Sequence, residues 1–159
     1  MPRVIRRATV KDLARIQEIA EASYARYVSR IGRRPAPMDA DIEAQIGQGA
    51  VYVHDGPPPL GYIVFWSEGR DMTLDAVGVA PDASGRGIGK ALIGYCESEA
   101  ARLGLDRVSL YTNAKMTENL SMYPHLGYVE THRQMQDGFD RVFFEKPVQP
   151  RSTSTDPTE

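Results

Sequence analysis

Apolar residues between Leu13 and Ile31 recur at intervals of three and four positions. This spacing places them on one face of an amphipathic helix. Just before the stripe, Thr9 is followed by Asp12, a pattern that resembles the capping box of a helix start. The sequence therefore predicts a long helix that packs on a sheet through Leu13, Ile16, Ala20, Tyr24, Tyr27, Val28 and Ile31.

Short runs rich in β-branched and aromatic residues predict strands on both sides of this helix. The run from Val4 to Arg7 precedes the helix. Turns rich in glycine, proline and aspartate separate three later runs, which predicts an antiparallel meander. These three strands are expected at Ala50 to His54, Leu60 to Trp66 and Met72 to Val79.

Prolines break the helical pattern at two places. The segment Gly32 to Met38 carries two prolines and predicts a loop, after which Asp39 is expected to cap a short helix that ends near Ile46. A second short helix is predicted from Thr117 to about Leu126. Because Pro124 lacks an N–H, we expect the last turn of this helix to be irregular.

The second half of the chain predicts a crossover and a hairpin. A strand at Arg107 to Thr112 follows a helix that ends at Gly104, so this strand should run parallel to the strand before the helix. Two further strands, Tyr128 to Met135 and Arg141 to Lys146, flank Asp137-Gly138, a typical hairpin turn. The buried face of the crossover helix is expected to contain Leu92, Cys96, Ala100 and Leu103.

Strands and helices thus alternate along a chain of 159 residues, of which 42% are hydrophobic. This content is enough for one core, and the order of elements predicts one α/β (α+β) domain at 1–147. From position 148 to 159 the chain is polar and contains prolines, so we expect a flexible tail there.

Charge and cysteine content narrow the function. A formal net charge of -2 gives no global field for nucleic acid or anionic lipid, so we expect neither partner. The single cysteine and three scattered histidines lack the spacing of metal ligands, so no metal is expected. The N-terminus lacks the apolar core of a signal peptide, which predicts a cytoplasmic protein.

The strongest chemical signal is the glycine-rich junction between the strand ending at Val79 and the next helix. It places glycines at positions 85, 87 and 89. Unpaired N–H groups of a first helical turn bind phosphate, and glycine lets an anion approach the backbone. We therefore predict a phosphate site, although a glycine-rich turn without a ligand remains the alternative.

Two other phosphate motifs fit this junction less well. A P-loop requires a glycine at position 84 and a hydroxyl residue at position 91, where the chain has Ser84 and Ala91. A dinucleotide fingerprint requires a glycine at position 90, where the chain has Lys90.

The run Ser84-Gly85-Arg86-Gly87-Ile88-Gly89 resembles the acyl-CoA motif of the GNAT superfamily of acetyl-CoA-dependent N-acyltransferases. Val77, Val79 and Pro81 precede it as the family pattern has them, and Arg86 occupies the usual basic position. Ser84 departs from the usual Gln or Arg, which affects one side-chain contact. The family mainly uses backbone amides here.

A second segment, Asn119 to Tyr128, resembles the family block that ends in Tyr, two residues, Leu-Gly and an aromatic residue. Tyr123 occupies the family's tyrosine position, and the resemblance covers Val4 to Lys146. It implies a central, mostly antiparallel mixed sheet of about six to seven strands, splayed between the fourth and fifth and flanked by about four helices.

The resemblance also implies roles for individual residues. Acetyl-CoA would be the co-substrate, with its pantetheine bound by the backbone of Val77 and Val79 and its pyrophosphate by Ser84, Gly85, Arg86, Gly87, Ile88, Gly89 and Lys90. The amide of Val79 is the candidate for polarising the thioester carbonyl. Tyr123 is the candidate general acid and cofactor contact, unless it only fills the core.

The remaining roles are less determined by the sequence. Asp75 alternates with Val77 and Val79, so we expect all three on one side of the strand, with Asp75 as the base or its water relay. Asn113 and Asn119 either contact the cofactor or serve turn and cap chemistry. Reserve bases are Glu118, His125 and His132, and the expected acceptor wall contains Tyr27, Arg33, Arg34, Met38 and Phe139.

We therefore predict an N-acetyltransferase that acts on a primary amine of a small molecule or peptide. A non-catalytic acyl-CoA sensor and a partner-binding subunit remain as alternatives. The exposed edges expected in the last hairpin favour a homodimer.

Overall fold

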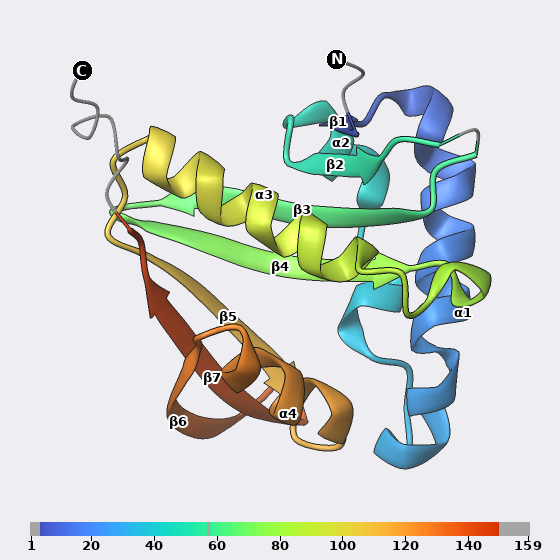
Figure 1. Ribbon diagram of the computed structural model, residues 1–159. Coiled ribbons are helices and arrows are strands. Elements are labelled where there is room, and N and C mark those ends of the chain that lie inside the picture. The colour runs from blue at the N-terminus through green and yellow to red at the C-terminus, as the bar shows by residue number, and fades with distance from the viewer. Residues whose placement is uncertain (1–3, 57, 150–159) are drawn as a thin grey trace, which may run out of the picture.

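The computed structural model describes residues 4–56 and 58–149, and its centre is one seven-stranded sheet (Figure 1). The strand order is β1-β2-β3-β4-β5-β7-β6, and the only parallel neighbours among these strands are β4 and β5. This confirms the mixed, mostly antiparallel sheet. The strands are β1 (Ile5–Arg7), β2 (Val51–His54), β3 (Gly61–Glu68), β4 (Asp71–Val79), β5 (Arg107–Asn113), β6 (Val129–Gln136) and β7 (Phe139–Pro147).

Helices cover both faces of the sheet. A Cβ on Gly78 would meet Ser23 of α1, whereas one on Gly61, which pairs with Val79, would meet Ile88 and Leu92 of α3. Since neighbouring residues of a strand face opposite sides, α1 and α3 lie on opposite faces. Figure 1 shows α3 lying across β3 and β4. The helices are α1 (Leu13–Ile31), α2 (Ile42–Gly47), α3 (Ile88–Arg102) and α4 (Thr117–His125), and the 3₁₀ turns are Val10–Asp12, Ala36–Asp39 and Pro81–Ala83.

The caps of the first two helices differ in how well the sequence predicted them. The Thr9–Asp12 capping box is confirmed, and it opens the 3₁₀ turn directly before α1. The prediction that Asp39 caps the next helix is wrong. Asp41 caps α2 by accepting from the amide of Ala44, whereas Asp39 lies in the preceding 3₁₀ turn and pairs with Arg34 at 2.8 Å.

The parallel pair β4 and β5 separates after a short ladder. Only Asp71 to Leu74 pair with Arg107 to Leu110, and beyond them β4 continues to Val79 with β3 as its one recorded ladder partner. Figure 1 shows the two strands meeting at one end and diverging toward the other. The predicted splay between the fourth and fifth strands is therefore present.

The hairpin and the short helix near the C-terminus follow the prediction, whereas Leu103, expected on the buried face of α3, is 50% exposed. The hairpin β6–β7 turns at Asp137 and Gly138, both with positive φ (52° and 82°), as a two-residue hairpin turn requires. Pro124 lies within α4. The helix ends in an irregular turn, where the amide of Leu126 donates to the carbonyls of both Met122 and Tyr123. Strand β6 forms the sheet edge and is exposed along almost its whole length.

Near the C-terminus, Val148 is half-buried against the core and its amide donates to the backbone carbonyl of Asp106. This residue belongs to the segment expected to be a flexible tail, and it is docked. Positions 150–159 of that segment lie outside the described residues. Within 4–56 and 58–149, no helix is long and apolar enough to cross a membrane.

Candidate active site

A cleft of about 480 Å³ opens where β4 and β5 diverge. Its walls come from α1, the Ala36–Asp39 turn, the second half of β4, the end of β5, α4 and the start of β7. Eight of the residues singled out by sequence for catalysis or cofactor binding line this space. They are Asp75, Val77, Val79, Ser84, Gly89, Asn113, Asn119 and Tyr123.

The expectation that Asp75 shares one side of β4 with Val77 and Val79 is wrong. Val64 pairs with Ala76, but the next residue, Phe65, pairs with Leu74, so β4 carries one extra residue at Asp75. Such a β-bulge interrupts the alternation of side chains. Val79 lies on the α3 side of the sheet, whereas the Asp75 carboxylate meets α2, which packs against α1.

The carboxylate of Asp75 is half-buried and only weakly hydrogen-bonded. Gln45 of α2 donates to its Oδ2 at 3.4 Å. Burial raises the pKa of Asp75, while the Gln45 hydrogen bond and the charge of Arg141 act in the opposite direction. A carboxylate in such a setting binds a proton more readily than an exposed one, which suits proton abstraction in a cleft.

The free edge of β4 presents backbone groups to the cleft. The amide of Ala80 donates to the carbonyl of Leu60, the residue directly before β3. Hydrogen-bonded and non-hydrogen-bonded pairs alternate in an antiparallel ladder, so the backbone groups of Val79 and Val77 point away from β3. The hydroxyl of Tyr24 already donates to the carbonyl of Val77 at 2.8 Å.

The glycine-rich junction forms a bend with open space above its backbone. Gly85 and Gly87 adopt positive φ (81° and 78°), and a Cβ on either would meet no atom within 4 Å. Gly87 is the residue directly before α3 and offers no side-chain cap, so the first amides of α3 lack a capping partner. This is a backbone cradle suited to an anion. Arg86 and Lys90 are exposed beside it, and Ile88 is buried.

Tyr123 of α4 is almost fully buried and lies at the wall of the cleft. Its ring packs against Tyr128 and Phe144, with ring centroids 5.6 and 5.7 Å apart. Burial raises the pKa of Tyr123, which keeps its hydroxyl protonated at neutral pH. No described residue hydrogen-bonds this hydroxyl, so it can serve a group inside the cleft.

Asn113 and Asn119 take part in local structure at the same wall. The side-chain oxygen of Asn113 accepts from the amide of Lys115 at 2.8 Å, which forms a turn after β5. Asn119 donates to Thr112 at 3.1 Å and to the sulfur of Met116 at 3.6 Å. The turn role of Asn113 is thus present, whereas Asn119 caps no helix end and instead links α4 to the end of β5. The role of both residues toward a cofactor stays a prediction.

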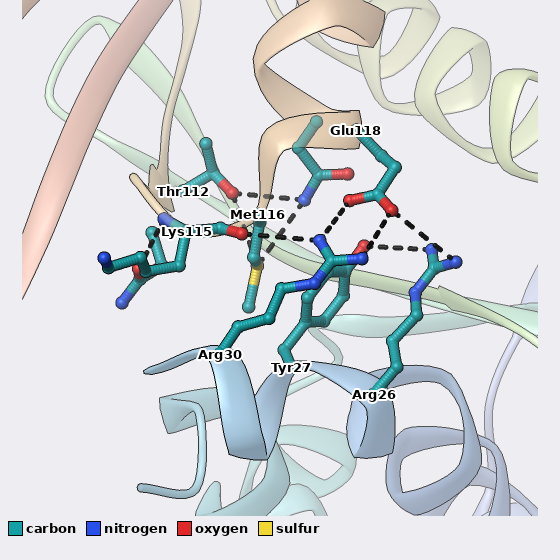
Figure 2. A network of polar contacts seen from close by, with 9 residues as sticks. Arg26, Tyr27, Arg30, Thr112, Lys115, Met116 and Glu118 are labelled. Atoms are coloured by element: carbon teal, nitrogen blue, oxygen red, sulfur yellow. Dashed lines mark hydrogen bonds and ion pairs between the residues drawn. The ribbon is translucent and has the colours of Figure 1, made fainter. Parts of the chain in front are cut away.

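A polar bridge joins α1 to α4 next to these residues (Figure 2). Arg30 makes two hydrogen bonds to the carboxylate of Glu118, at 2.7 and 3.0 Å. Figure 2 shows Arg26 approaching the same carboxylate from the neighbouring turn of α1, at 4.0 Å, while it also donates to the Tyr27 hydroxyl.

This bridge argues against one reserve base. The hydrogen bonds from Arg30 lower the pKa of Glu118 to about 2, which makes its carboxylate a poor proton acceptor. His125 and His132 are exposed and do not line the cleft, and His132 stacks on Phe143 instead, with ring centroids 4.3 Å apart. Asp75, which lines the cleft, therefore remains the candidate base.

The expected acceptor wall is only partly right. Tyr27 and Phe139 line the cleft. Arg33 lies over the Phe139 ring and Met38 packs with Tyr24 and Tyr27, but neither Arg33 nor Met38 lines the cleft. Arg34 is held by Glu21 and Asp39.

Sequence reasoning missed two residues of this wall, Tyr111 and Arg141. Arg141 lines the cleft with only 7% of its surface exposed. A signal was present in the sequence, because Arg141 lies two residues from the apolar Phe139 and two from Phe143, so that the three side chains share one face of a strand. Within 4–56 and 58–149 there is no group of three or more His, Cys, Asp or Glu residues that could hold a metal ion.

Comparisons with known proteins agree with this geometry. The family model described as "Acetyltransferase (GNAT) family" matches residues 13–128. A curated relative, mycothiol acetyltransferase of Pseudarthrobacter chlorophenolicus, is 48% identical over 52 residues, which are 33% of this chain and 16% of that protein. The match thus spans about a sixth of the relative's length.

Solved structures show the same fold. The PaiA N-acetyltransferase of Thermoplasma acidophilum, in complex with coenzyme A, is similar with a TM-score of 0.75 and 18% identity, over 90% of this chain and 97% of that one. The ribosomal-protein-alanine N-acetyltransferase of Brucella melitensis has a TM-score of 0.70 and 22% identity, over 92% and 100%. Since the family model matches well over half of its length, the chain belongs to the GNAT family of acetyltransferases.

Proposed function

We propose that this protein is an N-acetyltransferase that moves the acetyl group of acetyl-CoA to a primary amine of a small molecule or peptide, by direct attack in a ternary complex. One observation carries the proposal. The cleft between β4 and β5 contains the open backbone edge at Val79, the hydroxyl of Tyr123 and the carboxylate of Asp75, and it adjoins the glycine cradle before α3.

The residues at the donor end fit a long, phosphate-bearing thioester. The cradle at Gly85 and Gly87 leaves room above its backbone for a pyrophosphate. The N–H groups of Val77 and Val79 suit an extended chain laid beside the free edge of β4, as an added strand would lie. The neighbour solved with coenzyme A supports a CoA thioester as the donor.

The reaction needs a hydrogen-bond donor for the thioester oxygen, a general base and a general acid. The neutral amine attacks the thioester carbon, a C–N bond forms, the C–S bond breaks, and the amine loses a proton. In our proposal the amide of Val79 stabilises the negative charge on the thioester oxygen. Asp75 takes the amine proton directly or through water, and Tyr123 gives its proton to the departing sulfur.

The surroundings of the Tyr123 hydroxyl and the Asp75 carboxylate support an acid role for the first and a base role for the second. Burial raises the pKa of both, which keeps the Tyr123 phenol protonated and makes the Asp75 carboxylate a better base than an exposed aspartate. Glu118 lacks this property because of Arg30.

A mass-spectrometric screen tests the proposal. The protein is incubated with acetyl-CoA and pools of primary amines, and both acetylated products and free CoA are measured. We expect an acetylated amine together with an equal amount of free CoA, and a much smaller yield from Tyr123→Phe. Binding of acetyl-CoA without product would instead indicate a sensor, and neither binding nor product would favour a partner-binding subunit.

A further inference from the structure

A buried guanidinium forms one wall of the cleft. Arg141 of β7 packs over the ring of Tyr111 at 4.3 Å and over the ring of Phe139 at 5.4 Å. Arginine is rarely buried unless it is paired or has a charged ligand to bind. Arg141 is therefore expected to have either a charged partner in the protein or a charged ligand.

The protein itself neutralises this charge only weakly. Among the described residues, the recorded polar partners of Arg141 are Gln136, at 3.1 Å, and Asp137, at 3.5 Å, and both are reached from Nη1. Gln136 is uncharged, and the side chain of Asp137 is 84% exposed, so water screens that ion pair. A guanidinium offers five N–H donors in a planar fork, so most of its binding capacity remains.

The opposite charge lies in the same cleft. Asp75 and Arg141 both line it, and they are close enough for the charge of Arg141 to act on the carboxylate. Burial raises the pKa of the Tyr111 hydroxyl, the charge of Arg141 lowers it and the charge of Asp75 raises it, so both charges lie near Tyr111. The cleft thus combines one carboxylate, one guanidinium and the aromatic rings of Tyr111 and Phe139.

We infer that the acceptor amine carries a carboxylate that Arg141 binds, so that the substrate class is an amino acid or a similar small amino-carboxylate. This inference rests on the proposed acetyl transfer and adds only the recognition of the acceptor. A carboxylate fits the planar fork of one guanidinium with two parallel hydrogen bonds. A polyamine would instead bring a second positive charge toward Arg141, which disfavours it.

The wild-type protein provides the first test. Acetylation rates are compared for pairs that differ only in the carboxylate, phenylalanine with phenethylamine and tyrosine with tyramine. We expect kcat/KM at least about tenfold higher for the amino acids, because one hydrogen bond between charged groups has roughly that effect. Equal or higher kcat/KM for the amines without a carboxylate overturns the inference but leaves the acetyltransferase activity established. If no amine of any kind is acetylated, the proposed function fails first.

A second arm separates the carboxylate from other anions. β-Alanine is compared with taurine and phosphoethanolamine, which carry a sulfonate and a phosphate. A preference for β-alanine supports the carboxylate, and a preference for either other anion contradicts it.

Variants of Arg141 provide an independent test. In Arg141→Gln we expect KM for the amino acids to rise about tenfold or more, while KM for phenethylamine changes little. Arg141→Lys keeps the charge without the planar fork, so its KM for the amino acids should lie between those of the wild type and Arg141→Gln. Arg33→Gln is the matched control, because Arg33 lies 4.1 Å over the same Phe139 ring without lining the cleft.

Equal losses on both kinds of substrate in Arg141→Gln would show that Arg141 only supports the fold, and would overturn the inference. Circular dichroism and acetyl-CoA binding check that each variant is folded. If Arg141→Gln does not fold, the comparison of substrate pairs in the wild-type protein decides the question alone.

Discussion

The hydroxyl of Tyr24 donates a 2.8 Å hydrogen bond to the backbone carbonyl of Val77, and this bond joins α1 to the open edge of β4. The edge has no neighbouring strand at this point, because β5 has already diverged. Tyr24 therefore satisfies a carbonyl that a regular sheet would pair with another strand. The proposed donor site at Val77 then relies on the N–H of this residue.

Replacing Tyr24 with phenylalanine should lower the free energy of unfolding. The change removes a buried donor and leaves the Val77 carbonyl without that partner, which costs about 1–3 kcal/mol. Urea denaturation followed by circular dichroism measures the loss. Tyr62→Phe is the matched control, since the Tyr62 hydroxyl is buried with no hydrogen-bond partner in the described structure, and its removal should be neutral or stabilising. Similar losses of unfolding free energy in both variants would show that the hydrogen bond from Tyr24 to Val77 does not stabilise the fold.

The hydroxyl of Tyr123 should matter for turnover more than for donor binding. We expect Tyr123→Phe to reduce kcat about 10²- to 10⁴-fold, the usual contribution of a positioned general acid, with the Kd for acetyl-CoA nearly unchanged. Steady-state kinetics and calorimetry measure the two quantities.

Tyr128→Phe provides the control for Tyr123. Tyr128 contacts the Tyr123 ring, but its hydroxyl donates to Glu97 at 2.8 Å and it does not line the cleft. This variant should lose about 1 kcal/mol of stability and keep its turnover. The acid role is untenable if Tyr123→Phe retains the wild-type kcat.

Periodicity and turn chemistry were enough to predict the order of strands and helices, because each element carries its own pattern. The stripe from Leu13 to Ile31 and the Asp137-Gly138 turn are two such local signals. The glycine junction and Tyr123 were found by motif, and both lie where β4 and β5 separate.

The remaining features of the site depend on contacts between distant segments. The bulge at Asp75 arises from the register between β3 and β4, which alternation along β4 does not reveal. Arg141 becomes part of the cleft only because β7 pairs with β5. The cap at Asp41 was missed because two aspartates lie close together, and the chain path after Pro37 decides between them.

Gly87→Ala should weaken donor binding beyond its effect on stability. Its positive φ makes alanine unfavourable by about 1–2 kcal/mol, and the new Cβ enters the space proposed for the pyrophosphate. We expect the Kd for CoA to rise about tenfold or more, as expected when a hydrogen bond to a charged group is lost.

Gly104→Ala controls for the backbone effect. Gly104 has a similar φ of 72° and open space around it, but it follows the far end of α3. It should show the same loss of stability with unchanged CoA affinity. Equal changes in Kd for the two variants would remove the cradle from the donor site. Isothermal titration calorimetry makes the comparison.

Asp75→Asn should stabilise the fold at neutral pH and impair catalysis. Burial is the largest influence on the pKa of Asp75 and raises it, so the folded protein binds this proton more tightly than the unfolded chain does. The contribution of Asp75 to stability is then fully present below its unfolded pKa, near 3.9, and is lost as pH rises through the higher folded pKa. At neutral pH the wild-type protein must keep a charge at this half-buried position, and the asparagine variant need not.

The ionisation of Asp75 should also appear in the kinetics, where a rise in pH increases activity although it lowers stability. A base must be ionised to act, so wild-type kcat/KM should rise with pH through the raised pKa of Asp75. Asp75→Asn should lose this acidic limb and about 10²- to 10⁴-fold in rate, while its stability advantage over wild type shrinks as pH falls. Urea unfolding at neutral and mildly acidic pH, combined with pH–rate profiles, tests both effects. An unchanged acidic limb in the variant would show that another group accepts the proton, because a removed carboxylate cannot titrate.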